Sequence, residues 1–284
     1  MDEVKGKICI VTGSNSGIGK ETALGLAEKN AKVVMVVRNI ERGSMARKEI
    51  VSKSHNDNVH LMLCDLSSLE SIRTFVQEFK ATYERLDVLI NNAGAFFRKR
   101  QVTADGFENT LAVDYLAPFI LTYELLPILK SSAPSRIINI SSGFYTSAKI
   151  DFNDFQSEKK YRWMRAYANA KLMILMFTYE LARRLGNDRV TVNAVLPGFV
   201  ATNLGKNAGS HILSLMFKLM RPFQISAQKA AETPLYLASS KDVEGITGKC
   251  FAKMKEVDTS EASHDQQTQK TLWETTLKLL GISN

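Results

Sequence analysis

The stretch TGSNSGIG, residues 12–19, decides how the rest of this chain is interpreted. It directly follows KICIVT (residues 7–12), a short β-rich run, and opens residues 17–29, where Ala23, Leu24 and Ala27 have helical spacing. Glycines in such a turn adopt backbone conformations that a Cβ would hinder, and they let the backbone approach phosphates closely. The N-terminus of the following helix favours a pyrophosphate. The strand–turn–helix context therefore favours a phosphate-binding turn over a tight turn without a ligand.

Short apolar runs alternate with helix-like segments along the rest of the chain, which predicts βαβ units and a parallel sheet. The continuous apolar character of the runs agrees with a sheet that is covered on both faces. Further strands are expected at residues 32–37, 58–64, 86–90, 136–140, 189–195 and within 245–252. Helices are expected at residues 40–53, from the N-cap Ser68 to about 83, at 105–130 and at 163–185. Residues 253–284 are expected to form a C-terminal loop followed by an amphipathic helix at about 265–280. The predicted fold class is α/β, a single-domain Rossmann-type doubly wound sheet over residues 1–284, with about seven mostly parallel strands and helices on both faces.

Composition sets further limits on the class of protein. The chain has 284 residues, and its longest apolar runs, such as residues 33–37, are too short to cross a bilayer. The N-terminus carries no apolar segment long enough for a secretory signal, so a cytoplasmic location is expected. Cys9, Cys64 and Cys250 are odd in number and widely spaced, which suggests neither a disulfide framework nor a metal site.

The net charge of +8 raises the question of an anionic partner. Basic residues cluster in RKR (residues 98–100) and in KKYRWMR (residues 159–165), where Tyr161 and Trp163 are interleaved. A solvated basic surface explains them, and so does attraction to an anionic ligand, a nucleic acid or a lipid. No recognised nucleic-acid motif accompanies the clusters, so no nucleic-acid partner is expected, while peripheral contact with a membrane stays open.

The spacing of Gly13, Gly17 and Gly19 resembles the TGxxxGxG signature of short-chain dehydrogenases/reductases. Four further motifs carry this resemblance in the family's order: NNAG (residues 91–94), NISSG (139–143), YANAK (167–171) and PGFVAT (197–202). The longer spacer of 25 residues between Ser142 and Tyr167, together with residues 180–185 and 272–281, resembles the retinol-dehydrogenase-like branch. Light-dependent protochlorophyllide reductases share a similar framework. The resemblance covers nearly the whole chain, and it implies an oxidoreductase.

The end of the second expected strand bears on the choice of cofactor. NAD-preferring sites usually place an acid there to bond the ribose 2′-OH, but this chain has Val37 followed by Arg38. An arginine can hold a 2′-phosphate bidentately, which favours NADP(H) over NAD(H), although Arg38 can also be a solvated strand-end residue. In the family, an acid placed like Asp65 meets the adenine amino group; the alternative for Asp65 is a helix N-cap. The resemblance assigns cofactor contacts to Gly13, Ser14, Asn15, Ser16, Gly17, Ile18, Gly19, Arg38, Asn39, Asp65, Leu66, Asn91, Ala93, Gly94, Tyr167, Lys171, Pro197, Gly198, Val200 and Thr202.

Tyr167 and Lys171 lie four residues apart, on one helical face. A free tyrosine has a pKa near ~10, and a nearby lysine cation favours the phenolate, so the pair suits general acid/base chemistry. The resemblance implies that Tyr167 transfers the proton and that Lys171 holds the ribose and tunes Tyr167. It also implies that Ser142 bonds the substrate oxygen, with Ser141 as the structural alternative.

The segment TLAVDYLAPF (residues 110–119) departs from the family pattern. Asp114 stands where the family has a catalytic asparagine, and Asn109 is a competing candidate that fits the following residues less well. The main-chain role of that asparagine can survive the change, but an ionised Asp114 near Lys171 would partly cancel the pull of Lys171 on Tyr167. The alternative is an Asp114 that is satisfied by nearby donors. Pro118 is expected to distort the helix locally.

The Met-rich, apolar residues 208–223 follow PGFVAT, in a region that caps the substrate site in the family. We expect residues 207–223 to form a substrate lid, with an interface or core helix as the alternative. The resulting hypothesis is an NADP(H)-dependent oxidoreductase that interconverts a hydrophobic aldehyde or ketone and its alcohol, with no metal. A homodimer or homotetramer formed through helices that include the Tyr/Lys helix is expected by resemblance. Two alternatives stay open: an NADPH-binding regulatory protein with little turnover, and an interaction protein that uses its basic surface.

Overall fold

Seven parallel strands lie in the order β3-β2-β1-β4-β5-β6-β7, and an antiparallel strand, β8, follows at the edge next to β7. This is a computed structural model, and it describes residues 4–200 and 225–282. The strands are β1 (Ile8–Thr12), β2 (Lys32–Val37), β3 (Val59–Leu63), β4 (Val88–Asn91), β5 (Ser135–Ile140), β6 (Val190–Val195), β7 (Cys250–Ala252) and β8 (Lys255–Glu256). The predicted doubly wound parallel sheet is confirmed, but the sheet has eight strands rather than about seven. The two-residue strand β8 lies in a polar segment that was expected to be a loop.

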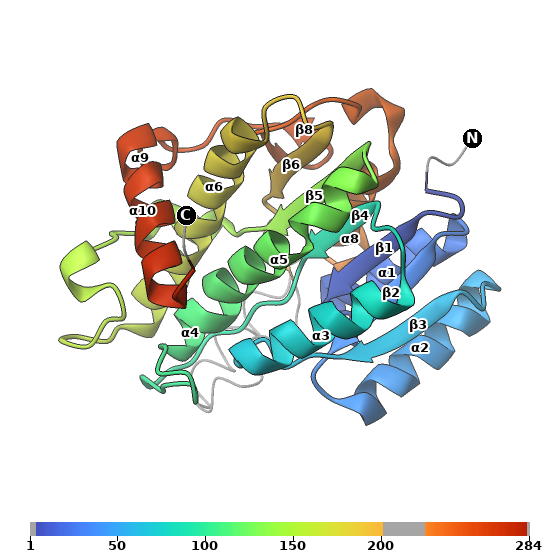
Figure 1. The fold of residues 1–284 in the computed structure, drawn as a ribbon, viewed down its shortest axis with the longest axis horizontal. Helices are drawn as coiled ribbons and strands as arrows, with labels where there is room; N and C mark the ends of the chain where they lie inside the picture. The colour runs from blue at the N-terminus through green and yellow to red at the C-terminus, as the bar shows by residue number, and fades with distance from the viewer. Residues whose placement is uncertain (1–3, 201–224, 283–284) are drawn as a thin grey trace.

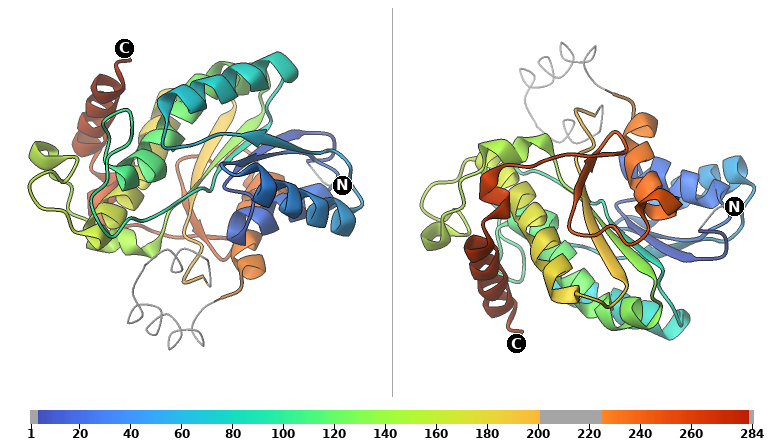
Figure 2. Two further views of the ribbon diagram at one scale, coloured as in Figure 1. Left: turned by 90° about the horizontal axis from the view of Figure 1, so that it is seen from below. Right: turned by 90° about the horizontal axis from the view of Figure 1, so that it is seen from above.

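The helices cover both faces of the sheet, as predicted (Figures 1 and 2). They are α1 (Gly17–Glu28), α2 (Ile40–Ser54), α3 (Leu69–Thr82), α4 (Asn109–Leu111), α5 (Ala117–Ser131), α6 (Trp163–Leu185), α8 (Ala227–Ser239), α9 (Glu261–His264) and α10 (Gln266–Leu280). Alternate residues of β1 point to opposite faces: Ile8 and Ile10 pack under α3, α5 and α6, whereas Cys9 and Val11 pack under α1, α2 and α8. Because both faces of the strands are buried, their sequences are apolar throughout.

The strand order reverses between β1 and β4. β1 pairs with β2 on one side and with β4 on the other, so that Ile10 lies between Val34 and Leu89. In open α/β sheets, ligands bind outside the carboxyl ends of the strands at such a switch point. The turns after β1 and β4, which hold residues 12–19 and 91–94, meet at this place.

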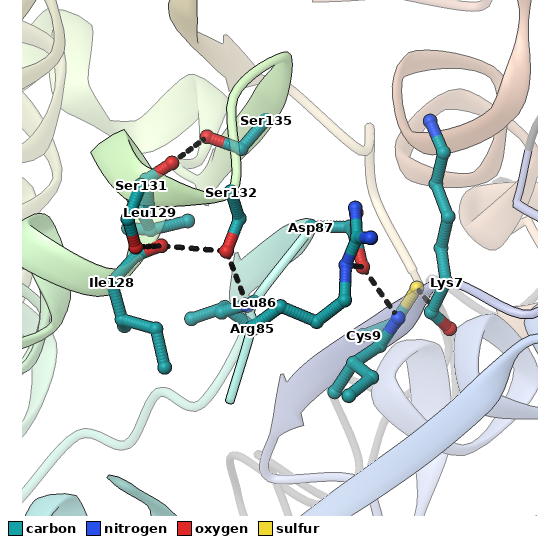
Figure 3. Close-up of polar contacts among 11 residues, drawn as sticks. Lys7, Cys9, Arg85, Leu86, Asp87, Ile128, Leu129, Ser131, Ser132 and Ser135 are labelled. Atoms are coloured by element: carbon teal, nitrogen blue, oxygen red, sulfur yellow. Dashed lines mark hydrogen bonds and ion pairs between the residues drawn. The ribbon is translucent and has the colours of Figure 1, made fainter. Parts of the chain in front are cut away.

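Short polar contacts connect the elements at the amino ends of the strands (Figure 3). The carboxylate of Asp87 accepts a hydrogen bond from the Ile8 amide at 2.8 Å, and Ser132 Oγ accepts one from the Leu86 amide at 2.9 Å. The Ser135 hydroxyl donates to the Leu129 carbonyl at 2.8 Å. These bonds satisfy buried backbone groups, so this end of the sheet has a structural role.

The long helix expected at residues 105–130 begins later and is divided. It starts with α4, passes through a π-helical turn, η1 (Ala112–Leu116), and continues as α5. Pro118 lies in the first turn of α5, next to the distortion that was predicted for it. Residues Asn109–Ser131 are long and apolar enough to cross a membrane, but 67% of their most apolar window is buried within this fold, as in a core helix.

The C-terminal helix α10 packs against α6. The Trp273 ring lies edge-on to Phe119 at 4.9 Å and stacked on Phe177 at 6.0 Å between centroids. The Arg184 guanidinium lies 4.3 Å from the centre of the Trp273 ring. The final helix expected at about residues 265–280 is therefore part of the core, whereas α8 was not predicted.

Candidate active site

Two glycines of the turn after β1 have left-handed backbone conformations, with φ of +65° at Gly13 and +58° at Gly17. A Cβ on Gly13 would lie 2.9 Å from the Ala93 Cα atom. A Cβ on Gly19 would lie 2.6 Å from the Gly13 carbonyl oxygen and would collide with the Asn92 side chain. The three glycines of the motif are therefore required by conformation or by close backbone packing.

Thr12 joins this turn to the turn after β4. Its hydroxyl accepts hydrogen bonds from the amides of Asn92 and Ala93, both at 2.9 Å, and the Asn92 side chain donates to the Thr12 carbonyl at 2.8 Å. Sequence reasoning missed this role of Thr12, although its position at the end of a strand before a glycine was a signal. These hydrogen bonds join the two turns into one unit at the switch point.

The residues of this unit fit a dinucleotide. Ser14 is fully buried, and its hydroxyl has no hydrogen-bond partner among the described residues. Ser16, which precedes α1, makes no side-chain capping bond, so the first amides of the helix are not satisfied by it. An anionic phosphate satisfies such amides and hydroxyls. Asn15, Gly17 and Ile18 complete the same turn.

The ends of β2 and β3 are neighbours, because Val37 pairs with Leu63. Arg38 is exposed directly after β2, and Asn39 caps α2 by accepting from the Arg42 amide at 2.9 Å. Asp65, next to Leu66, accepts from the Ser67 amide at 2.9 Å and the Ser67 hydroxyl at 2.7 Å. Ser68, rather than Asp65, is the N-cap of α3. Arg38 and Asp65 thus both flank the place where the adenosine half of a dinucleotide is expected.

Asn91 is structural as well as close to the site. Its side-chain amide donates to Asn139 Oδ1 at 2.8 Å and to Thr122 Oγ1 at 3.0 Å, and Asn139 donates to Thr178 Oγ1 at 2.9 Å. All four residues are buried. This polar chain links β4, β5, α5 and α6, and so fixes the strand ends that carry the chemistry.

Lys171, Tyr167 and Asp114 come together at the carboxyl ends of β4 and β5. Lys171 Nζ lies 3.3 Å from Asp114 Oδ2, 3.5 Å from the Ile140 carbonyl oxygen and 5.4 Å from the centre of the Tyr167 ring. A Cβ on Gly94 would lie 3.2 Å from Lys171 Nζ. The cluster is therefore adjacent to NNAG and, through it, to the glycine turn.

The two serines of NISSG have different surroundings. The Ser141 side chain is buried and donates to the Lys171 carbonyl at 2.8 Å, which fixes α6 against β5. Ser142 is partly exposed, and its hydroxyl accepts a long 3.4 Å bond from the Phe144 amide. The competing candidate Asn109 lies instead at the start of α4, bonded to Gln101 at 3.3 Å. This geometry favours Ser142 for substrate contact and Ser141 for structure.

Burial dominates the protonation behaviour of the cluster. Burial raises the pKa of Tyr167, and the Asp114 charge raises it further, whereas Lys171 and a hydrogen bond with Ser142 oppose the shift. Burial disfavours the Lys171 ammonium. The Asp114 carboxylate and the Tyr167 phenol favour the ammonium more strongly, so the pKa of Lys171 is raised. Burial also raises the pKa of Asp114, against the opposing charge of Lys171 and the Ala95 amide.

Aromatic side chains surround the Tyr167 phenol. The rings of Phe96 and Phe144 lie edge-on to it, with centroids at 5.9 and 6.1 Å, and Trp163 packs on Phe96 at 5.2 Å. Phe144 is 45% exposed. Sequence reasoning did not identify Phe96, Phe144 or Trp163 as site residues, because each comes from a different segment.

The spacer between Ser142 and Tyr167 folds back on the segment before α4. The Tyr161 hydroxyl donates to the Phe97 carbonyl, Gln156 accepts from the Glu108 amide at 3.0 Å, and Arg100 donates to the Gln156 carbonyl at 3.2 Å. Part of both basic clusters is thereby used in internal structure. Arg98 and Lys99 and, in the second cluster, Lys159, Lys160, Arg162 and Arg165 are exposed.

The segment after β6 is described only as far as Val200. Gly198 has φ of +84°, and Val200 forms an isolated parallel bridge with Ile225. Pro197 and Gly198, which the resemblance assigns to the cofactor site, lie directly after the carboxyl end of β6. Thr202 and the expected lid, residues 207–223, lie outside the described residues.

Cys9, Cys64 and Cys250 are free and buried, as expected for small apolar residues. Burial raises the pKa of the Cys64 and Cys250 thiols to about 12. Within residues 4–200 and 225–282, no three His, Cys, Asp or Glu side chains are grouped so that they could hold a metal ion.

The fold and this cluster define an oxidoreductase of the dinucleotide-binding α/β class, and the comparisons with known proteins agree. A family model described as "short chain dehydrogenase" matches residues 7–212. The chain belongs to the short-chain dehydrogenase/reductase family. It is 40% identical to mouse (Mus musculus) retinol dehydrogenase 12 over 280 residues, which cover 99% of this chain and 88% of that protein. The retinol-dehydrogenase-like resemblance is therefore confirmed.

Solved structures give the same result. A crystal structure of an uncharacterized protein from Mycobacterium paratuberculosis superimposes with a TM-score of 0.81 at 28% identity, covering 99% of this chain and 96% of that one. A protein described as an NAD(P)-dependent gluconate 5-dehydrogenase from Beutenbergia cavernae, with NADP bound, has a TM-score of 0.71 at 25% identity. That similarity covers 88% of this chain and 96% of the other. The chain therefore shares its fold with a protein that has NADP bound.

Proposed function

We propose that this protein is an NADP(H)-dependent oxidoreductase that interconverts a hydrophobic aldehyde or ketone and its alcohol. The observation that carries the proposal is the cluster of Tyr167, Lys171 and Ser142 beside NNAG, which is itself bonded to the glycine turn. The cluster offers a proton donor, a cation and a hydroxyl at one place.

The cofactor, when bound, supplies or accepts the hydride. Tyr167 gives its phenolic proton to the carbonyl oxygen in reduction and takes the proton back in oxidation. The Ser142 hydroxyl orients that oxygen and stabilises the charge that develops on it. Lys171 provides the positive charge that favours the phenolate when the proton leaves.

The preference for NADP(H) is supported by Arg38 at the end of β2. No acid occupies the preceding strand end, since Val37 stands there. A guanidinium in this exposed position can pair with a 2′-phosphate, which a carboxylate would repel. The resident cofactor site would use the glycine turn, Arg38, Asn39, Asp65, Leu66 and residues 91–94.

The hydrophobic substrate class is supported by the aromatic surroundings of Tyr167. Phe96 and Phe144 present ring surface beside the phenol, where the reacting oxygen is expected, and Trp163 packs on Phe96. Apolar walls with a few placed polar groups are typical of small-molecule sites. The lid at residues 207–223 remains a prediction, as do the cytoplasmic location, peripheral membrane contact and a homodimer or homotetramer.

A substrate screen tests the proposal. Purified protein is mixed with NADPH or NADH and a panel of aldehydes and ketones of increasing apolar length, and cofactor oxidation is followed. We expect NADPH-dependent turnover that improves with apolar length. Tight NADPH binding without turnover across the panel would instead support the regulatory alternative, which the partly cancelled charge of Lys171 also favours.

A further inference from the structure

The carboxylate of Asp114 is enclosed next to the catalytic cluster. It lies in the π-helical turn η1, its side chain is 0% exposed, and that of Lys171 is 4% exposed. Asp114 Oδ1 accepts a 2.6 Å bond from the Ala95 amide, just after NNAG. Asp114 therefore connects the Lys171 cation to the turn that contacts the glycine loop.

The second carboxylate oxygen of Asp114 is paired with the ammonium group of Lys171. Asp114 Oδ2 has no hydrogen-bond partner among the described residues, and it lies 3.3 Å from Lys171 Nζ. A carboxylate buried without a counter-charge is costly, and so is a buried ammonium. The two groups thus stabilise each other's charged forms in a place that water does not reach.

The pair alters what Tyr167 experiences. Lys171 alone would favour the phenolate, but a negative charge 3.3 Å from the ammonium cancels part of that effect. Burial and Asp114 both raise the pKa of Tyr167, in the same direction. Burial raises the pKa of Asp114, but the Lys171 ammonium at 3.3 Å and the Ala95 amide oppose that rise, because both favour the carboxylate.

Few other titratable groups act on the cluster. Glu108 acts on Asp114 from the start of α4, where its carboxylate accepts the amides of Thr110 and Leu111, both at 2.8 Å. Tyr161 faces Asp114 from the spacer, and burial raises the pKa of Tyr161 to about 12, so it stays neutral where enzymes are assayed. From α6, Lys171 acts on Asp114, and Asp114 in turn acts on Tyr167.

We propose that Asp114 is a positioning residue that holds Lys171 in a buried ion pair and weakens the electrostatic effect of the Lys171 ammonium on the Tyr167 phenol. This inference rests on the proposed function. In reduction, the bound cofactor would supply a hydride, which carries both electrons, to the carbonyl carbon, and Tyr167 gives its phenolic proton to the oxygen. The phenolate that remains is reprotonated from solvent. A phenol that stays protonated can donate its proton to the carbonyl oxygen over a wide pH range. Alcohol oxidation needs the phenolate and is therefore confined to alkaline pH. The equilibrium between the carbonyl compound and its alcohol is unchanged.

The test compares pH profiles of kcat/KM for alcohol oxidation in the parent, Asp114→Asn and Asp57→Asn. Asp57 is exposed in the loop before β3, so its variant makes the same charge change away from the site. In the parent, kcat/KM for alcohol oxidation should rise with pH as Tyr167 loses its proton. We expect this rise to occur at a pH lower by about one unit or more in Asp114→Asn, and at the parent's pH in Asp57→Asn. Superimposable parent and Asp114→Asn profiles would overturn the inference, as would an equal shift in Asp57→Asn.

A titration of Tyr167 separates this inference from the proposed function and needs no turnover. The phenolate absorbance of the parent minus that of Tyr167→Phe reports this one residue against pH. We expect its midpoint in the parent to lie above ~10, the value of a free tyrosine, and to fall in Asp114→Asn. A parent midpoint at or below that value would overturn the inference even if the enzyme turns over or Asp114→Asn does not fold. If the substrate screen fails but the midpoint is raised, the proposed function fails and the electrostatic role of Asp114 stands.

Discussion

The glycine turn and the catalytic cluster lie next to each other but are held in place by different forces. The turn is fixed by backbone geometry: Gly13 and Gly17 have positive φ, and Thr12 bonds the turn to Asn92 and Ala93. The cluster is fixed by buried polar side chains, in which the Lys171 ammonium is paired with Asp114. A motif made of backbone tolerates little change, whereas a cluster of charges can be retuned by a single residue, and Asp114 is such a residue.

The comparison predicts its largest effects at the reacting atoms. Ser142→Ala removes the hydroxyl that is proposed to stabilise the substrate oxygen, and we expect kcat to fall by about 10²–10³-fold with unchanged NADPH affinity. Ser141→Ala is the matched control. It should lower the free energy of unfolding by about 0.5–1.5 kcal/mol, because a buried hydrogen bond to the Lys171 carbonyl is lost, and should affect kcat less. A larger loss of kcat in Ser141→Ala than in Ser142→Ala would reverse the two assignments.

The next largest effect is expected in the glycine turn. Gly19→Ala places a methyl group 2.6 Å from the Gly13 carbonyl oxygen and against Asn92. We expect NADPH affinity, measured by fluorescence titration, to fall by about 10- to 100-fold, because the turn must shift. Gly143→Ala adds the same group where no atom lies within 4 Å and should keep the parent affinity. Equal affinities in both variants would mean that the turn does not bind the cofactor.

The smallest effect concerns the choice between the two cofactors. Arg38→Asp replaces an exposed cation by an anion at the end of β2, and the affinity for NADPH relative to NADH should fall by about 10-fold or more. Lys48→Asp makes a similar charge reversal on the exposed side of α2 and should leave the ratio unchanged. A parent-like ratio in Arg38→Asp would show that Arg38 is only a solvated strand-end residue.

The fold was largely predictable from the sequence, because apolar strands, glycine turns and helix caps are local signals. The helix at residues 163–185 and the N-cap Ser68 are found where they were predicted. The short strand β8 was missed because its two residues, Lys255 and Glu256, are polar and exposed, so they carry no apolar pattern. The division of the helix at residues 105–130 by the π-helical turn around Asp114 depends on tertiary packing and was only partly signalled by Pro118.

The candidate site was predictable only where motifs fix its residues. Motif spacing indicated Tyr167, Lys171 and Ser142, and it placed Asp114 near Lys171. The contact of Asp114 with the Ala95 amide and the ring contacts of Phe96, Phe144 and Trp163 join segments far apart in the chain. No local pattern encodes such contacts, because they depend on how the strand ends converge.

The central claim is that cofactor binding and proton transfer belong to these two separate regions. Single-turnover oxidation of bound NADPH by an apolar aldehyde, measured in the parent and in Tyr167→Phe, tests it most directly. The account predicts that Tyr167→Phe binds NADPH as tightly as the parent and oxidises it at least about 100-fold more slowly, because the phenolic proton is gone. A Tyr167→Phe rate equal to that of the parent would contradict the account.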